Sequence, residues 1–448
     1  MHNTVTMTEG PIGREMICFA IPIMLGNLFQ QLYNIADSII VGNFLGHAPL
    51  AAVTASASLS FMMIGFMMGL SSGAGVVISH YYGAGDRVNL KKSINTTVIF
   101  GFIFSALLTV LCVYFTPDIL VLMGTPDTVL DLATVYMQIF FCGSIGIGMY
   151  NIFVGIMQAV GDNKHPLYYL IFSSILNVAL DLAFVMFTDL GVAGAAIATI
   201  ISQFASAFLC LFKLCRTKDI YRIELSKMRM DGEMLKQIIK VSVPSGLQNS
   251  IISLANVVVQ SYINSFGDMA MAGIGAYGKV ESFAFVPIMS FNIAITTFIS
   301  QNIGAGEFDR AKKGARFGIF ASILTAQLIG VIMFIFAPQL IAAFDRTPEV
   351  IRFGVEKTYT SVPFFFALAF THAVSSVIRG TGQAFLPMAI MVACWCIIRV
   401  IILAIAIPMT HSIQVLYWIY PVTWSLSAVI FLFLYKRRDY IKNRITGD

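Results

Sequence analysis

A carboxylate stands in the middle of one of the most apolar stretches of this chain. In SSILNVALDLAFV, residues 173–185, Asp181 follows Asn177 by four positions. On a helix the two side chains would share one face. Thr199, in the next apolar stretch, adds a hydroxyl oxygen. Ionisable groups in such stretches are costly to bury and typically mark a functional path, so we expect these residues to form a site.

An earlier apolar stretch carries a polar stripe that ends in a second carboxylate. Its members recur every three to four residues and would face one side of a helix: Asn27, Gln30, Asn34 and Asp37. One predicted site therefore combines Asp37, Asn177, Asp181 and Thr199. Carboxylate, hydroxyl and amide oxygens suit a proton or a hard cation such as Na⁺. A purely structural hydrogen-bond network between helices is the alternative interpretation.

The second half of the chain has a polar stripe of its own, which carries no acid. The stripe consists of Asn249, Ser253, Asn256, Gln260 and Asn264. Three ionisable residues lie in later apolar stretches: Lys279, Glu281 and Arg399. Lys279 and Glu281 are two positions apart and would face different sides of a helix, so a gate and a structural pairing both stay open. Arg399 would face either a central cavity or a structural counter-ion. The candidates to line a central cleft are these three ionisable residues together with Asn27, Gln30, Asn34, Asn249, Asn256 and Gln260.

The composition indicates what kind of molecule holds these groups. Of the 448 residues, 58% are hydrophobic and 11% are charged, whereas a soluble protein carries about 25% charged residues. Runs without any Asp, Glu, Lys or Arg, such as 38–85 and 400–435, are long enough for membrane-spanning helices. The sequence predicts an all-α polytopic membrane protein with twelve transmembrane helices. They cover residues 16–42, 51–78, 93–115, 132–157, 166–187, 191–213, 237–264, 270–300, 316–337, 356–378, 385–408 and 413–435.

The distribution of basic residues predicts the orientation. Most of the 28 Lys and Arg residues fall in segments that share one side of the membrane if the N-terminus is cytoplasmic. The predicted outer loops hold only Arg346, Arg352 and Lys357, and the outer segment TPDTVLD is acidic. Both termini are therefore expected in the cytoplasm. The net charge of +5 follows this topology and gives no reason to expect a nucleic-acid partner.

The chain repeats itself in two halves. SHYYGAGDRVNLKK (79–92) aligns with SQNIGAGEFDRAKK (300–313), and GIMQAVGDNKHP (155–166) aligns with SVIRGTGQAFLP (376–387). Six spans per half is an even number, so the repeat is parallel, and such folds carry substrate between their halves. We predict an N-lobe over residues 1–221 and a C-lobe over 222–448. The Gly-Ala-Gly loops lack the Gly-Lys-Ser/Thr of a phosphate cradle, so they indicate helix ends and not a nucleotide site.

These motifs together resemble the multidrug and toxic compound extrusion (MATE) transporters over essentially the full length. The motifs are ADSIIVGNFLG, QAVGDNKHP, NVALD and RGTGQAFLP, in this order. The resemblance implies two six-helix lobes around a V-shaped cleft and export of organic cations in exchange for H⁺ or Na⁺. It assigns ion coupling to Asp37, Asn177, Asp181 and Thr199, where Na⁺ would bind. It implies no enzymatic activity, no cofactor beyond the coupling ion, and a monomer surrounded by lipid in a bacterial inner membrane.

The sequence departs from this family in its second half. No acid occurs between Val241 and Gly267, and the position that is acidic in the tenth helix of some members falls at Thr371. This favours coupling through the N-lobe alone. A related flippase for lipid-linked precursors is the first alternative, although few bases are available to bind a pyrophosphate. An intramembrane enzyme is the second, and nothing in the sequence resembles a catalytic base with its nucleophile.

The topology can be tested by cysteine labelling of intact cells. On a background without the seven native cysteines, an impermeant thiol reagent should label a cysteine placed at Thr128 and spare one placed at Arg222. Thr128 lies in the acidic outer segment and Arg222 in the basic segment between the halves. Labelling at Arg222 alone would refute the span order and the parallel repeat that depends on it.

Overall fold

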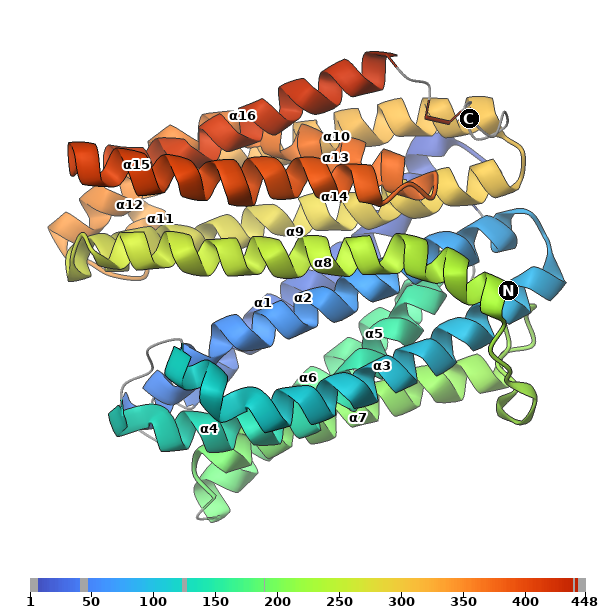
Figure 1. Ribbon diagram of the computed structural model, residues 1–448, viewed down its shortest axis with the longest axis horizontal. Coiled ribbons are helices and arrows are strands. Elements are labelled where there is room, and N and C mark those ends of the chain that lie inside the picture. Colours follow the sequence, from blue (N-terminus) through green and yellow to red (C-terminus); the bar gives the residue numbers. More distant parts are fainter. Residues whose placement is uncertain (1–6, 41–46, 123–126, 189, 438–439, 442–448) are drawn as a thin grey trace. The chain divides into compact units, whose positions relative to one another are not determined.

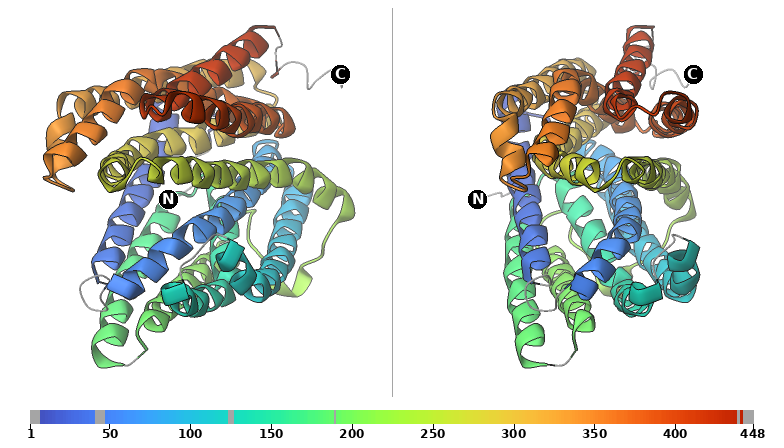
Figure 2. Two further views of the ribbon diagram at one scale, coloured as in Figure 1. Left: turned by 60° about the vertical axis from the view of Figure 1, so that its left-hand side comes forward. Right: turned by 90° about the vertical axis from the view of Figure 1, so that its left-hand side faces the viewer.

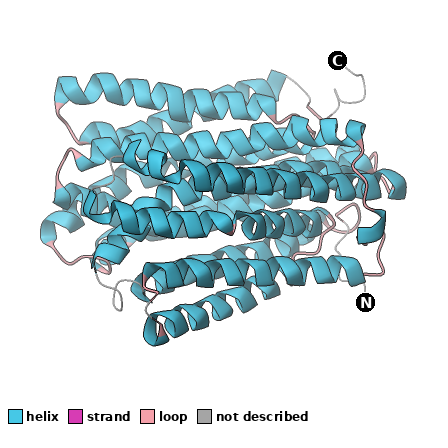
Figure 3. Cartoon of the chain, turned by 60° about the horizontal axis from the view of Figure 1, so that its bottom comes forward, coloured by secondary structure: helices cyan, strands magenta, loops and turns pink. Residues whose placement is uncertain are grey.

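The protein is a bundle of long helices. The computed structural model describes residues 7–40, 47–122, 127–188, 190–437 and 440–441; the side chains of 33–58, 122, 127–129, 185–186 and 192 also lie outside the description. Across these ranges the chain forms helices joined by short loops, with no strand (Figure 3). The predicted all-α class is confirmed.

The chain divides into two compact units. The first consists mainly of Leu25–Gly246, and the second combines Thr6–Met24 with Leu247–Asp448. Two helices contribute to both units, because α1 (Ile12–Ile40) and α8 (Gly232–Asn264) each run through a unit boundary. The predicted lobe limits at residues 221 and 222 stay a prediction.

The first unit is built from the later part of α1, six further helices and the start of α8. The six are α2 (His47–Gly83), α3 (Arg87–Leu122), α4 (Asp127–Cys142), α5 (Ser144–Ala159), α6 (Lys164–Phe187) and α7 (Val192–Arg216). α6 packs along α7, and α5 packs against α2, α3 and α7 (Figure 1). A short 3₁₀ segment, η2 (Leu225–Lys227), interrupts the linker to α8.

The second unit follows the same plan with more interruptions. Its helices are α9 (Asp268–Gly304), α10 (Phe308–Ile335), α11 (Ala337–Ala342), α12 (Pro348–Ser361), α13 (Phe365–Gly380), α14 (Phe385–Val392), α15 (Arg399–Thr410) and α16 (Gln414–Arg437). A 3₁₀ turn, η3 (Val362–Phe364), joins α12 to α13, and a π-helical segment, η4 (Ala393–Ile398), joins α14 to α15. α13 packs against α9, α10 and α16 (Figure 2).

The observed spans follow the predicted order. Among the described residues, ten helical segments are long and apolar enough to cross a membrane, and the bent pair α4–α5 makes eleven. The remaining predicted span coincides with α8. This helix carries the polar stripe and is not apolar enough to be counted with the others. The tenth span begins earlier than predicted, at Pro348 instead of residue 356.

The backbone repeats along with the sequence. Gly85 and Gly306, each just past a helix end, have φ of 66° and 79°. Gly161 and Gly382, in the second aligned motif, have φ of 86° and 89°. L-residues with a Cβ rarely adopt such angles, so glycine at these turns is a conformational requirement. The glycine loops after α2 and α9 are therefore helix ends, as the sequence predicted.

Each unit holds the segment that precedes the first helix of one repeat. In the second unit, the guanidinium of Arg310 in α10 donates to the carbonyl oxygens of Met7, Glu9 and Gly10 at 3.2, 2.6 and 2.7 Å. Asn302 also donates to the Met7 carbonyl, at 3.1 Å. These bonds fix the chain just ahead of α1.

In the first unit, the start of α3 plays the same role for the linker that precedes α8. Lys91 pairs with Glu224 at 3.1 Å, and Lys92 pairs with Asp231 at 3.0 Å. Hydrogen bonds from Lys227 and then Lys91 lower the pKa of Glu224 to about 2. The linker therefore stays anchored at neutral pH, and α8 starts inside the first unit.

Two glycines allow α2 and α8 to approach closely within the first unit. A Cβ on Gly69 would lie 2.5 Å from Gly246 Cα, and one on Gly73 would lie 2.4 Å from Ser242 Cα. Small residues four apart permit such backbone contact between membrane helices. The Ser242 hydroxyl completes the contact by donating to the Leu70 carbonyl at 2.9 Å.

We expect Gly73→Ala to destabilise the protein by about 1–3 kcal/mol, because its Cβ would meet backbone that cannot yield. Gly75→Ala is the matched control in the same helix, since its Cβ would lie 3.6 Å from the nearest atom, an ordinary contact. The measurement is thermal unfolding in detergent, with the folded fraction monitored by size-exclusion chromatography. Equal stability of the two variants would contradict the close packing of α2 and α8.

Candidate functional site

The structure brings together three of the four residues predicted to couple an ion. Asn177 and Asp181 lie on one face of α6 with 1% and 0% of their surface exposed. The Asn177 amide can take two orientations, and one of them gives both its nitrogen and its oxygen a hydrogen-bond partner. In it, the amide nitrogen donates to Asp181 Oδ2 at 2.9 Å, and the amide oxygen accepts the backbone N–H of Thr199 at 3.1 Å.

Local sequence explains this arrangement. The loop between α6 and α7 is short, so the two helices form an antiparallel pair. Gly194 lets them pack tightly, because a Cβ there would lie 3.0 Å from Phe184 Cβ. Thr199 faces α6 and keeps its hydroxyl within its own helix, where Oγ1 donates to the Ala195 carbonyl at 3.0 Å.

The fourth member of the set lies beyond the part of the site that can be described. Asp37 and Asn34 belong to the last turns of α1, and their side chains are outside the described residues. Asn27 is partly buried and Gln30 is exposed, both on the same helix. The meeting of Asp37 with Asp181 stays a prediction.

The donor atoms of the described part suit a proton or a hard cation. Asp181 offers carboxylate oxygens and Thr199 a hydroxyl oxygen, the ligands that such ions prefer. The Asn177 amide oxygen accepts the Thr199 N–H, which leaves one of its two lone pairs for an ion. Among the described residues no three His, Cys, Asp or Glu side chains cluster as a transition-metal site would require.

The polar stripe of the second half lies on α8 and is more exposed. Asn256 and Gln260 are exposed and Asn249 is partly buried. Gln260 donates to Asn264 Oδ1 at 2.8 Å, which is a local bond along one helix face. The lining role of these residues stays a prediction.

Lys279 and Glu281 face different sides of α9, as their spacing predicted. Lys279 is exposed, with its Nζ 5.4 Å from the centre of the Phe344 ring. Glu281 is partly buried, and its Oε1 accepts the hydroxyl of Tyr277 at 2.6 Å. The two side chains therefore do not pair with each other.

Lys357 corrects the sequence analysis, which placed it in an outer loop. It lies in α12 and is 3% exposed. Its Nζ donates to the carbonyl oxygens of Leu416 and Tyr417 at 3.0 and 3.2 Å. Pro421 lies within α16 and has no N–H for the Tyr417 carbonyl, four residues earlier. The lysine supplies the missing donor.

Two signals in the sequence could have located Lys357. Pro348 follows Thr347 and precedes Glu349, a pattern typical of a helix start, so the tenth span could have been started near Pro348, which places the lysine inside the span and not at its edge. A proline inside the last predicted span also indicates a carbonyl that needs another donor. Neither signal identifies the partner, which depends on packing between distant segments.

Arg399 is also buried near Lys357, over the same Tyr420 ring, and is 2% exposed. Its Nε and Nη2 both donate to the Thr423 hydroxyl, at 3.3 and 2.9 Å. The guanidinium carbon is 4.3 Å from the centre of the Tyr420 ring, and Lys357 Nζ is 4.2 Å from the same ring. The residue directly follows η4, and π-helical segments of this kind occur frequently at functional sites.

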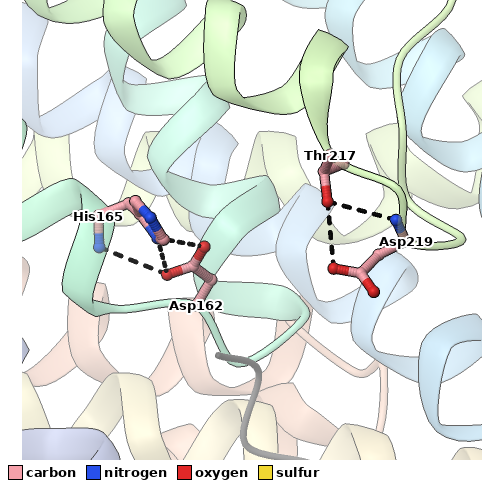
Figure 4. Close-up of polar contacts among 4 residues, drawn as sticks. All are labelled: Asp162, His165, Thr217 and Asp219. Atoms are coloured by element: carbon pink, nitrogen blue, oxygen red, sulfur yellow. Dashed lines mark hydrogen bonds and ion pairs between the residues drawn. The ribbon is translucent and has the colours of Figure 1, made fainter. Parts of the chain in front are cut away.

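A polar contact also fixes the beginning of α6. Both carboxylate oxygens of Asp162 lie 2.8 Å from His165 Nδ1, and Asp162 is 1% exposed (Figure 4). In the second repeat the matching positions are Gln383 and Leu386, so the pair is specific to the first. It supports the helix that carries Asn177 and Asp181.

Comparison with known proteins agrees with the duplicated, two-unit fold. A family model described as MatE matches the chain twice, over residues 22–183 and 244–405. The probable multidrug resistance protein YoeA of Bacillus subtilis is 28% identical over 97% of both chains. A second B. subtilis relative, the probable multidrug resistance protein YpnP, is 29% identical over 84% of both. A solved structure, a crystal structure of MATE in the bent conformation, has a TM-score of 0.91 and 22% identity, covering 99% of each chain.

The fold and these matches define an integral membrane protein of the helical transporter class, with two six-helix halves made by duplication. The chain belongs to the MatE family, the multidrug and toxic compound extrusion transporters. The two matched segments are equally long and agree with the predicted repeat to within one residue. The resemblance inferred from the sequence motifs is thereby confirmed.

The contact between Lys357 and the Pro421 kink can be tested by a double-mutant cycle. Lys357→Met should destabilise the protein by about 1–3 kcal/mol, because the Tyr417 carbonyl loses its donor. In a Pro421→Ala background the restored N–H can bond that carbonyl, so the same substitution should cost less. Thermal unfolding of the four proteins measures the difference, with Lys279→Met as an exposed control. An equal cost in both backgrounds would show that the lysine does not serve the kink.

Proposed function

We propose that this chain exports organic cations across the membrane in exchange for H⁺ or Na⁺. The observation that carries the proposal is the fully buried Asp181, held by Asn177 beside Thr199, in a chain of the MatE family. A buried carboxylate in a membrane-spanning helix is costly and typically marks a path for ions or protons. The curated relatives named as multidrug resistance proteins support the substrate class.

The exchange follows from competition for one negative charge. An ion that reaches Asp181, and Asp37 on the sequence prediction, neutralises the charge that would attract a cationic substrate. Loading the ion therefore weakens substrate binding, and binding linkage makes the effect reciprocal. A coupling of about 1–3 kcal/mol would change substrate affinity by roughly 5–150-fold.

The small side chains around Asp181 have separate tasks in this scheme. Asn177 orients the carboxylate through the 2.9 Å bond to Oδ2, and its own orientation depends on the Thr199 N–H. The Thr199 hydroxyl donates to the Ala195 carbonyl within its own helix, so the lone pairs of its oxygen stay available to an ion. We propose these three residues with Asp37 as the coupling site, in the first unit alone.

The proposal includes the setting of the protein. We propose a bacterial inner membrane with both termini in the cytoplasm, a monomer in contact with lipid, and no cofactor beyond the coupling ion. A lipid-linked precursor flippase is the second candidate, and one observation favours it: two bases, Lys357 and Arg399, are buried in the second unit. Flipping of a fluorescent lipid pyrophosphate in vesicles, without export of cations, would select this alternative.

Transport by reconstituted vesicles tests the assignment to the first unit. With an imposed pH or Na⁺ gradient, Asp181→Asn should abolish accumulation of a fluorescent organic cation while the protein stays folded. Asp118→Asn, an exposed acid in α3 of the same unit, is the matched control and should transport normally. Glu281→Gln should have a milder effect. An inactive Glu281→Gln beside an active Asp181→Asn would move the coupling site to the second unit.

A further inference from the structure

The last helix of each half ends in the same pair of side chains. The sequence LFKLCR (211–216) of α7 aligns with LFLYKR (432–437) of α16, at the offset that also relates 79–92 to 300–313. The guanidinium carbon of Arg216 lies 4.5 Å from the centre of the Phe212 ring. That of Arg437 lies 4.4 Å from the centre of the Phe433 ring. The same arginine–phenylalanine stack therefore occurs at equivalent positions of both units.

Both arginines mark the end of a membrane-spanning segment. The apolar spans run over Ala193–Arg216 and Gln414–Arg437, and each has 24 residues. At a rise of about 1.5 Å per residue, such a helix is about 36 Å long, whereas the hydrocarbon core of a bilayer is about 30 Å thick. The two guanidinium groups are therefore expected at the level of the lipid head groups.

An exposed apolar track leads along each helix to its arginine. In α7 the track consists of Phe208 and Phe212, which are 65% and 45% exposed and whose ring centres are 6.2 Å apart. In α16 it consists of Val429 and Phe433, which are 64% and 54% exposed. Residues four apart share one helix face, so each track and its arginine form one continuous surface. In a membrane, the apolar part of this surface contacts acyl chains.

The guanidinium groups are available to a partner outside the chain. Both arginines are exposed, and no carboxylate oxygen lies within 4.0 Å of either among the described residues. Asp219, three residues after Arg216, accepts the Thr217 hydroxyl at 3.1 Å (Figure 4). Each guanidinium stacks on the ring one turn earlier, whereas an arginine that needed only water would extend away from the span. Stacking leaves the N–H edge of the guanidinium free for a two-pronged contact with a phosphate group.

We propose that each arginine–phenylalanine stack binds the phosphate of an anionic phospholipid, with an acyl chain along the apolar track. Arg216 and Arg437 supply the charge, and the two phenylalanine rings hold the guanidinium groups in place. A zwitterionic lipid binds less tightly, because its ammonium group offsets the phosphate charge. On the predicted topology both sites face the cytoplasmic leaflet, where the lipids hold the last helix of each half at the same depth. The inference goes beyond the cation exchange proposed above and does not require it.

Native mass spectrometry of the purified protein in a neutral detergent counts the bound lipids. Phosphatidylglycerol should give two tightly bound molecules, each held about tenfold or more tightly than phosphatidylcholine. Arg216→Gln and Arg437→Gln should each remove one of them, and the double variant should remove both. Phe212→Leu keeps the apolar surface but loses the stack, so it should weaken one site severalfold.

Lys218→Gln and Lys436→Gln are the matched controls. Both lysines are exposed cations close to the arginines in sequence, and neither stacks on a ring within the described part of the chain. The double lysine variant removes as much charge as the double arginine variant. It should nevertheless keep both tightly bound lipids.

Three outcomes would overturn the inference. Equal binding of phosphatidylglycerol and phosphatidylcholine would show no anionic site, and an equal loss in the lysine and arginine variants would show diffuse attraction. Displacement of the lipid by inorganic phosphate at constant ionic strength would indicate a site for free phosphate. Asp181→Asn should abolish cation export and leave lipid binding intact, so this proposal and the proposed function can fail separately.

Discussion

In a membrane, each buried polar group has to find its partner inside the protein, because hydrocarbon supplies none. This constraint accounts for the sites of the chain. Asp181 is tolerated in α6 because Asn177, one turn earlier, donates to it and is itself oriented by the backbone of α7. Lys357 is tolerated in α12 because Pro421 leaves a carbonyl that needs a donor.

The same constraint separates the two units by charge. The described site of the first unit is an acid among neutral oxygens, which suits a cation or a proton. The second unit instead buries two basic side chains, Lys357 and Arg399, near the partly buried Glu281. Gene duplication supplied two similar frames, as the paired glycine turns show. The two frames now carry different buried charges, and we propose cation exchange for the first unit.

The sequence predicted the elements well, because its strongest signals are local. Charge-free runs marked the spans, and the four-residue spacing of Asn177 and Asp181 placed both on one face, as observed. Lys357 was counted with the outer loop because the tenth span was started at residue 356, directly before it, although the Thr347-Pro348-Glu349 pattern indicated an earlier start. Its partners, Leu416 and Tyr417, are some sixty residues away in the chain, and the π-helical η4 carries no local signal. Such features depend on tertiary packing, which spacing and composition do not reveal.

The ends of the helices also show which features the sequence alone can predict and which it cannot. The glycine loops after α2 and α9 could be assigned from sequence, because left-handed backbone requires glycine. The way in which α1 and α8 each begin in one unit and continue in the other could not, because it rests on Arg310 and on the lysines of α3. Only long-range contacts identify those anchors.

Competition between the coupling ion and the substrate at Asp181 is the central claim. Equilibrium binding of a fluorescent organic cation to the purified protein, scanned in pH and in Na⁺, measures it directly. With H⁺ as the coupling ion, affinity should fall as the pH falls and respond little to Na⁺. With Na⁺ as the coupling ion, affinity should fall as Na⁺ replaces K⁺ at constant pH. In both cases the dependence should vanish in Asp181→Asn. Affinity that ignores both ions, or that depends on them equally in Asp181→Asn, would contradict the account.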